Sequence, residues 1–216
     1  MEKLKKITAE INAKIAESMF AIIDEAIAER RRHQSRHSKL ILKTWGPGAI
    51  ARSYAAVNAA YSIAANVIPG PAGMMAMVPE VLAVTRNHVR LLYDIGVMAG
   101  REDQLSRELF IAILLDEHGS PDAQLITRYE SELFVKRASM AAARGLAERL
   151  SVAITGRYLR TAAIRWIPLA GITAIAWWTW NNTVSLAGRG LEFMKLELKE
   201  HDQEYHPPES GKSEAK

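Results

Sequence analysis

The chain has 216 residues, enough for one domain or two small ones. Hydrophobic residues make up 49% and the mean hydropathy is −0.07, which argues against a polytopic membrane protein. The absence of cysteine excludes disulfides and thiol chemistry and permits a cytoplasmic location. We expect no signal peptide, because the first residues contain no continuous apolar run.

The net charge of +4 is unevenly distributed along the chain. No acidic residue lies between Glu29 and Glu80, and Glu148 is the only one between Leu133 and Leu191. Both basic regions adjoin stretches without any charge, 53–79 and 166–188. Such flanks attract anionic lipid headgroups or nucleic acid, and we expect lipid rather than nucleic acid here. The alternative is an ordinary solvated surface.

Apolar residues recur every three or four positions at the N-terminus and predict a long amphipathic helix to about residue 31. They are Leu4, Ile7, Ile11, Ile15, Met19, Ile22 and Ala26. A short apolar piece, 40–45, ends at Gly46-Pro47-Gly48. The next helix, from about 49 to 67, is rich in Ala and Ser, which let helices approach closely.

Further helices are predicted over about 74–98, 105–118, 146–166 and 172–199. Ser120, as N-cap, and Pro121, in the first turn, predict one more, running to about 141–145. No alternating pattern of useful length favours a strand, so the expected fold class is all-α. The predicted architecture is a helical bundle with two apolar helix-turn-helix hairpins and a long N-terminal amphipathic helix. The polar residues from 200 onward predict a disordered tail.

Two Pro-Gly signals interrupt the apolar helical pattern and predict the tips of the two hairpins. The first tip contains Pro69, Gly70 and Gly73, and the second contains Pro168 and Gly171. Each hairpin has one uncharged arm, of 16 and 17 residues, or about 25 Å of helix. A spanning helix needs about 20 apolar residues. The alternatives are therefore hairpins buried in a soluble core, hairpins embedded shallowly in a bilayer, and true spanning pairs.

Tryptophan and arginine side chains near the hairpins are the candidate contacts with a membrane or a partner protein. They are Trp166, Trp177, Trp178, Trp180, Arg30, Arg31, Arg32, Arg52, Arg165 and Arg189. Because Trp177, Trp178 and Trp180 point in different directions on a helix, only part of this cluster can serve one face. Core packing is the alternative for these tryptophans.

The sequence predicts no catalytic, metal-binding or cofactor-binding residue. His33 and His37 have the spacing of a helix-borne metal pair but lack a third ligand nearby. The segment Arg86–Asp94 also contains His88 and Arg90 and could form a polar network, with Arg90 and Asp94 as an i,i+4 pair. The phosphate-loop, Gly-x-Ser-x-Gly and His-Glu-x-x-His motifs are all missing.

Four segments form a recognisable set: Ile68–Gly73, Val89–Gly100, Ile167–Gly171 and Leu186–Gly190. In these segments the chain resembles the EcsC family, bacterial helical proteins associated with ABC transporters. Ala99-Gly100 stands where the family pattern has Tyr-Gly, and the second tip matches better. The resemblance spans about residues 50–195. It implies a membrane-associated accessory protein and carries over no catalytic residue.

These observations give a three-part organisation: an N-terminal helix and basic segment (1–45), an EcsC-like helical domain (46–199) and a polar tail (200–216). The leading hypothesis is a non-enzymatic protein on the inner face of the cytoplasmic membrane, docked on anionic lipid or a membrane protein. Homo-oligomerisation through the N-terminal helix is also expected. One alternative is a soluble protein-interaction module. Another is a hydrolase-like enzyme with its site near Arg86–Asp94.

Overall fold

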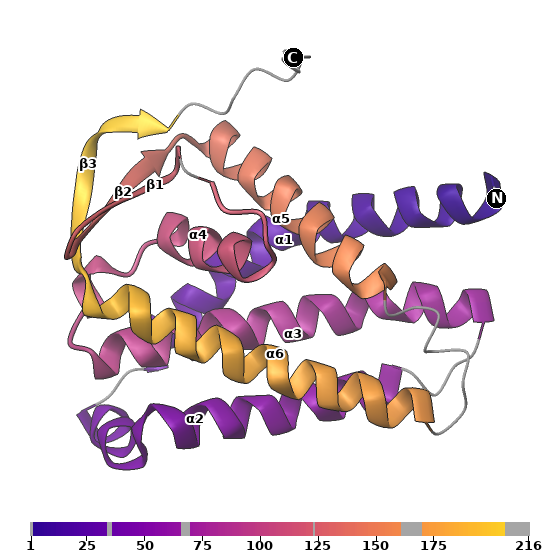
Figure 1. Ribbon diagram of the computed structural model, residues 1–216, viewed down its shortest axis with the longest axis horizontal. Coiled ribbons are helices and arrows are strands. Elements are labelled where there is room, and N and C mark those ends of the chain that lie inside the picture. The colour runs from indigo at the N-terminus through magenta and orange to yellow at the C-terminus, as the bar shows by residue number, and fades with distance from the viewer. Residues whose placement is uncertain (1, 34–35, 66–69, 123, 161–169, 206–216) are drawn as a thin grey trace.

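A computed structural model describes residues 2–33, 36–65, 70–122, 124–160 and 170–205. These residues form a helical bundle with a small sheet at one corner (Figure 1), so the all-α expectation is confirmed. In chain order the elements are α1 (Glu2–His33), α2 (Arg36–Ala65), α3 (Gly70–Met98), η1 (Glu102–Gln104), α4 (Arg107–Glu117), β1 (Ile126–Tyr129), β2 (Glu132–Ala138), α5 (Met140–Arg160), α6 (Ala170–Lys195) and β3 (Glu197–Tyr205).

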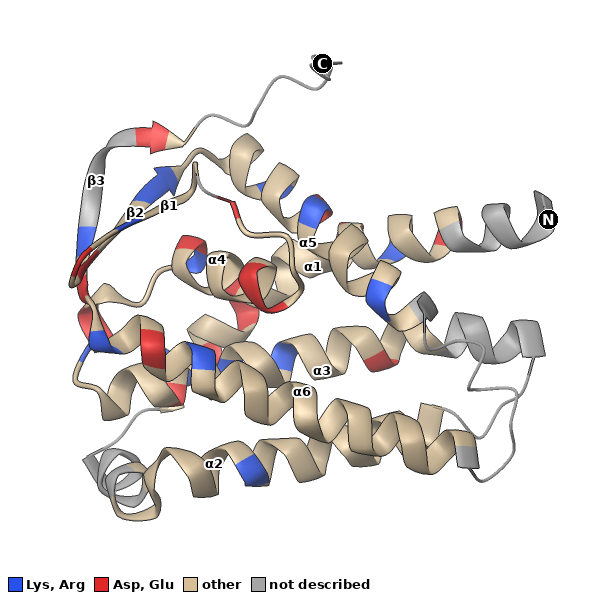
Figure 2. Ribbon diagram, in the orientation of Figure 1, with Lys and Arg blue, Asp and Glu red and all other residues tan. Residues whose placement is uncertain are grey.

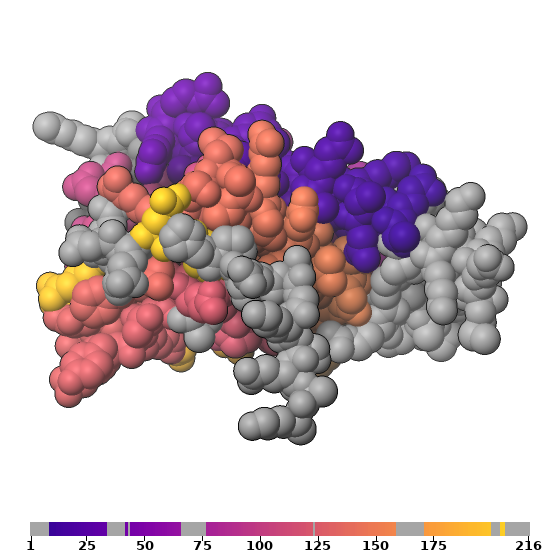
Figure 3. Space-filling model, turned by 90° about the horizontal axis from the view of Figure 1, so that it is seen from above, coloured from indigo at the N-terminus to yellow at the C-terminus, as the bar shows by residue number. Residues whose placement is uncertain are grey.

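Three helices, α2, α3 and α6, run side by side and pack on one another. Helix α1 packs on α3, and α5 crosses over α1, as Figure 3 shows from above. Helix α4 contacts both α5 and α6. The first predicted hairpin is therefore a packed pair, α2 with α3. In the second, α5 and α6 diverge, because α5 packs mainly on α1 and α6 mainly on α2.

The apolar stripe predicted for the N-terminal helix faces the core. Ile11, Ile15, Met19 and Ala26 of the predicted stripe are fully buried. The predicted Ile22 is only half-buried and its neighbour Ile23 is fully buried instead, which keeps steps of three or four residues along α1. The side chains of Leu4 and Ile7 lie outside the described residues. This spacing places them on one side of the helix, against α3 and α5. The stripe is therefore covered within the same chain.

Gly46 marks the break predicted before the second helix. Its φ of 72° lies in the left-handed region, which glycine enters without a steric penalty, and it separates two helical segments within α2. A second glycine, Gly190, allows close packing between α6 and α3. A Cβ at this position would lie 2.6 Å from Leu92 Cδ2.

The helix predicted from Ser120 to about residue 145 is wrong. Its central part forms the antiparallel pair β1 and β2, which a turn at Glu130 connects with a φ of 49°. The Asp122 side chain accepts hydrogen bonds from the backbone N–H groups of Gln124 and Leu125, at 2.9 and 3.2 Å. These bonds stabilise a turn at the place where the sequence predicted the start of a helix. β-Branched residues such as Ile126 and Val135 favour the strands that follow.

The end of the last predicted helix is also corrected. Helix α6 ends at Lys195, and residues 197–205 form β3, which pairs in parallel with β2 in the sheet order β1-β2-β3. The first six residues of the predicted disordered tail thus belong to a strand. Tyr205 is buried, and its hydroxyl donates to Asp122 Oδ2 at 2.8 Å. The rest of the predicted tail, 206–216, lies outside the described residues.

Candidate functional site

Helices α2 and α6 expose a surface without charged side chains over most of their length. Among the α2 side chains that the structure describes, only Arg52 is charged. On α6, Figure 2 shows charged residues only toward the C-terminal end. We define the α2–α6 surface by its exposed residues: Ser53, Ala56, Val57, Ala60, Tyr61, Ile63 and Ala64 of α2, and Thr173, Ala174, Trp177, Asn181, Val184 and Ser185 of α6. Large apolar side chains are prominent on it, with Tyr61 47% and Trp177 70% exposed.

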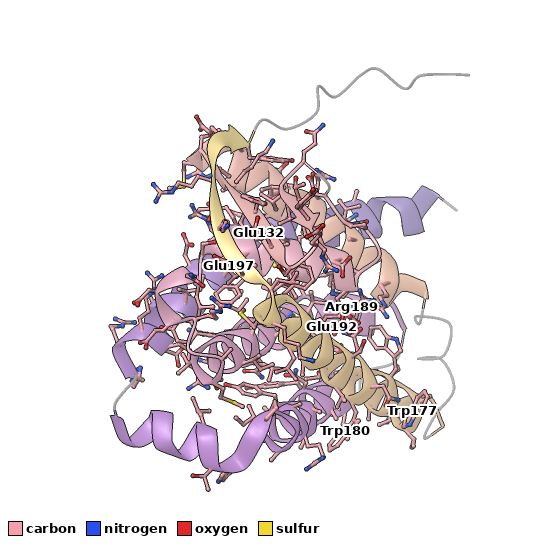
Figure 4. The ribbon with its side chains drawn as sticks, turned by 60° about the vertical axis from the view of Figure 1, so that its left-hand side comes forward. Glu132, Trp177, Trp180, Arg189, Glu192 and Glu197 are labelled. Atoms are coloured by element: carbon pink, nitrogen blue, oxygen red, sulfur yellow. The ribbon has the colours of Figure 1, made fainter. Side chains whose placement is uncertain are left out.

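The predicted tryptophan cluster is divided between surface and core. Trp177 extends into solvent, whereas Trp178 is half-buried and meets the Tyr158 ring edge to face, with centroids 5.0 Å apart. The Arg157 guanidinium lies 5.8 Å from the Trp178 ring centroid. Trp177 and the half-buried Trp180 lie toward the end of α6 that is far from the sheet (Figure 4). In that view Glu132 and Glu197 mark the sheet. Trp166 lies outside the described residues.

Two of the predicted contact arginines form ion pairs within the chain. Arg30 binds Asp94 at 3.0 Å and also contacts the Tyr54 hydroxyl. Arg189 binds Asp116 at 2.6 Å and Glu117 at 2.5 Å. These interactions occupy both guanidinium groups with carboxylates of neighbouring helices.

The other predicted contact residues differ in how far they are available. Arg31 is exposed and donates to the Leu105 carbonyl at 3.0 Å. Arg32 and Arg52 are exposed. Of the predicted tip residues, Gly70 and Gly73 lie in the first turns of α3, and Gly171 is buried near the start of α6. Arg165, Pro69 and Pro168 lie outside the described residues.

The charged segment Arg86–Asp94 joins α3 to α1. Arg86 binds Glu25 at 2.9 Å, and Arg90 binds Glu29 at 2.5 Å. Burial raises the pKa of Asp94 despite the nearby Arg30, and Tyr54 donates to its Oδ2 at 2.8 Å. The charged partners of Arg86, Arg90 and Asp94 thus all come from α1, and Arg90 also donates to Asn87 of α3 at 3.2 Å. Ion pairs between helices therefore replace the predicted i,i+4 pair. These contacts fix the positions of the three helices relative to one another.

A buried polar network joins α2, α3 and α6, and the sequence pattern did not reveal it. Asn58 donates to Thr183 Oγ1 at 3.1 Å and accepts from Asn87 at 2.8 Å. The hydroxyls of Ser62 and Thr179 are 2.8 Å apart. The available signal was the i,i+4 spacing of polar residues on both helices, inside stretches that carry no charge.

Two histidines lie in the core beside this network. His88 Nε2 is 3.1 Å from Thr183 Oγ1, and burial lowers the pKa of His88 to about 3. Burial also lowers the pKa of His118 to about 3, with further contributions from His88 and Arg157. Both imidazoles are therefore neutral at physiological pH. Among the side chains that the structure describes there is no group of three potential metal ligands, and the side chain of His37, which has metal-pair spacing with His33, lies outside them.

Replacing Thr183 with valine should destabilise the fold by about 2 kcal/mol. The change preserves shape but removes the acceptor of the Asn58 amide and the partner of His88, which leaves buried polar groups without hydrogen bonds. Urea unfolding followed by circular dichroism measures the effect. Val184→Thr, one residue away and 39% exposed, is the matched control and should change stability little. Equal stability of T183V and wild type would contradict the assigned role of the network.

The described residues also contain no helix that is long and apolar enough to cross a membrane. Comparison with known proteins found no match to a family model, a curated protein or a solved structure. The resemblance to the EcsC family therefore stays a prediction.

Proposed function

We propose that the protein is a non-enzymatic accessory protein that docks peripherally on an anionic membrane surface through the α2–α6 surface. The observation that carries this proposal is the uncharged exposed side of two adjacent helices, with Trp177 and Tyr61 directed to solvent. Tryptophan and tyrosine favour the membrane interface because an apolar ring and a polar group are accommodated at one depth. Exposed apolar surface of this kind marks interaction sites.

The charge of α2 specifies which lipid such a surface would meet. The helix contains Arg36, Lys39, Lys43 and Arg52 and no acidic residue, so its formal charge is +4. All four cations lie in its first 17 residues, and the uncharged part follows. A basic segment next to an apolar one is attracted to anionic headgroups while its apolar part enters the interface. Trp45, 58% exposed, lies within the basic part.

Vesicle binding tests this proposal with substitutions at exposed positions. We expect Trp177→Ala to weaken binding to phosphatidylglycerol-containing vesicles about tenfold, because one large side chain is then lost from the interface. Arg52→Gln should also weaken binding to these vesicles, and its effect should vanish at high salt because salt screens the lost attraction. Co-sedimentation at several salt concentrations measures both effects.

The control variants are matched in side-chain type and exposure. Tyr129→Ala removes an exposed aromatic ring (65%) from the β1–β2 corner, and Arg144→Gln removes an exposed cation from α5. Neither should change vesicle binding. Failure of the wild-type protein to bind anionic vesicles at low salt, or an equal loss with Y129A and W177A, would sink the lipid proposal.

A second candidate is docking of the same surface on a protein partner, such as a helix of a membrane protein. Small exposed residues on α2, namely Ser53, Ala56, Ala60 and Ala64, favour it because they permit close helix approach. Absence of vesicle binding together with a stable, monodisperse protein would favour this candidate. Self-association through α1 stays a prediction and would have to use outward-facing residues of that helix, since its apolar stripe is buried.

A further inference from the structure

A cavity of about 620 Å³ lies away from the α2–α6 surface, between the end of α1, the η1–α4 connection and the strands β2 and β3. Five of its lining residues are cationic, and they come from four elements: Arg31 of α1, Arg107 of α4, Lys136 and Arg137 of β2, and Lys199 of β3. Two lining residues, Asp103 and Glu108, are acidic. The fold therefore gathers distant cations around one hollow.

Two of these cations, Arg107 and Lys199, form ion pairs with carboxylates, and of these carboxylates only Glu108 lines the cavity. Arg107 binds Asp24 of α1 at 3.0 Å and also approaches Glu108, and Lys199 binds Glu132 of β2. Arg31 and Lys136 have no carboxylate partner among the described residues. Arg31 instead donates to the Leu105 carbonyl, which leaves further N–H donors on its guanidinium. These two side chains supply charge that the described part of the chain does not neutralise.

We propose that this cavity binds a small phosphorylated molecule with at least two negative charges. Arginine and lysine together suit phosphate, because arginine offers a planar fork of donors and lysine a compact charge. The volume lies within the range of small-molecule sites. Among the described lining residues none is aromatic, so a nucleobase would find no ring to stack on. The chemistry fits a phosphorylated sugar or polyol, either free or as a lipid headgroup.

Calorimetry with inorganic pyrophosphate and inositol trisphosphate, at physiological salt, tests the site without any membrane. We expect binding of both probes by the wild-type chain. Arg31→Gln and Lys136→Gln should each weaken binding about tenfold, because each removes a charge-assisted hydrogen bond. Both variants leave the ion pairs of Arg107 and Lys199 intact, and thermal unfolding checks that they fold.

Two neighbouring cations outside the cavity lining provide matched controls. Arg32→Gln and Lys195→Gln each remove one exposed positive charge and should leave binding unchanged. Absence of pyrophosphate binding by the wild type, or equal weakening in all four variants, would overturn the proposal. These probes are soluble, so failure here is distinct from failure of vesicle docking.

A second arm identifies the source of the ligand. Vesicles containing phosphatidylinositol bisphosphate are compared with phosphatidylcholine vesicles in the Trp177→Ala background, which weakens docking through the α2–α6 surface. Retention on the former that inositol trisphosphate competes away, and that K136Q abolishes, assigns the site to a lipid headgroup. Binding of the soluble probes without such retention assigns it to a free phosphorylated metabolite.

Discussion

Replacing Asp94 with alanine is expected to lower the free energy of unfolding by about 3 kcal/mol. The carboxylate is buried in contact with Arg30 of α1 and Tyr54 of α2, so its removal leaves a guanidinium and a hydroxyl without their partner. The Arg30 side chain is 32% exposed, which moderates the loss because water can solvate part of its charge. Chemical denaturation at neutral pH measures the change.

A double-mutant cycle with Arg30→Ala separates the interaction energy of the ion pair from the cost of removing each side chain. Because burial alone raises the pKa of Asp94, removing both charged groups should cost less than the sum of the single changes, by about 1–2 kcal/mol. The surface pair Lys14–Glu10 is the matched control, with the same 3.0 Å separation but about half of each side chain exposed. Glu10→Ala should change stability by less than about 0.5 kcal/mol. Equal losses in E10A and D94A would contradict the role assigned to burial.

Acid should destabilise the fold through His88 and His118. Each has an ordinary pKa of 6.5 and a folded-state pKa of about 3, so below pH 6.5 the unfolded chain binds protons that the folded chain does not. Their contribution is complete above pH 6.5 and is lost as the pH falls toward 3. The loss is about 1.4 kcal/mol per pH unit for each histidine, or on the order of 4 kcal/mol for both at pH 5.

The double variant His88→Gln/His118→Gln isolates this contribution. Burial raises the pKa values of Asp94 and Glu117, and these carboxyl groups change stability in the opposite direction as the pH falls. They are present in both proteins and cancel when wild type and variant are compared. The stability difference between pH 7 and pH 5 should be larger in the wild type by about 4 kcal/mol. Parallel pH profiles of the two proteins would show that the imidazoles titrate normally.

Local patterns were sufficient to predict the main helices. The stripe of α1 follows from a period near 3.6, and Gly46 ends one helical segment because glycine alone adopts its backbone conformation easily. The uncharged surface of α2 and α6 also follows from the sequence, since a stretch without charged residues has none to expose whichever side faces outward. These features depend on residues close together in the chain.

The sheet and the polar contacts depend on residues far apart in the chain, and sequence reasoning missed or misassigned them. The paired residues of β2 and β3 are more than 60 positions apart in the sequence, so local periodicity does not predict the pairing. A similar distance along the chain separates Arg30 from Asp94, whereas local spacing predicted the nearby Arg90 as its partner. A local spacing rule cannot predict which helix brings a charged partner close to Asp94 when the helices pack together.

The sequence by itself determined the helical class, the helix that begins the chain, and the placement of charge around two uncharged segments. Only the tertiary structure decided which arginines are neutralised inside the chain and which, such as Arg31 and Arg52, reach solvent. It also decided that distant cations surround one cavity. The physical reason is that hydrophobic periodicity is a property of neighbouring residues, whereas ion pairs, cavities and sheet pairing form only when separate segments pack together.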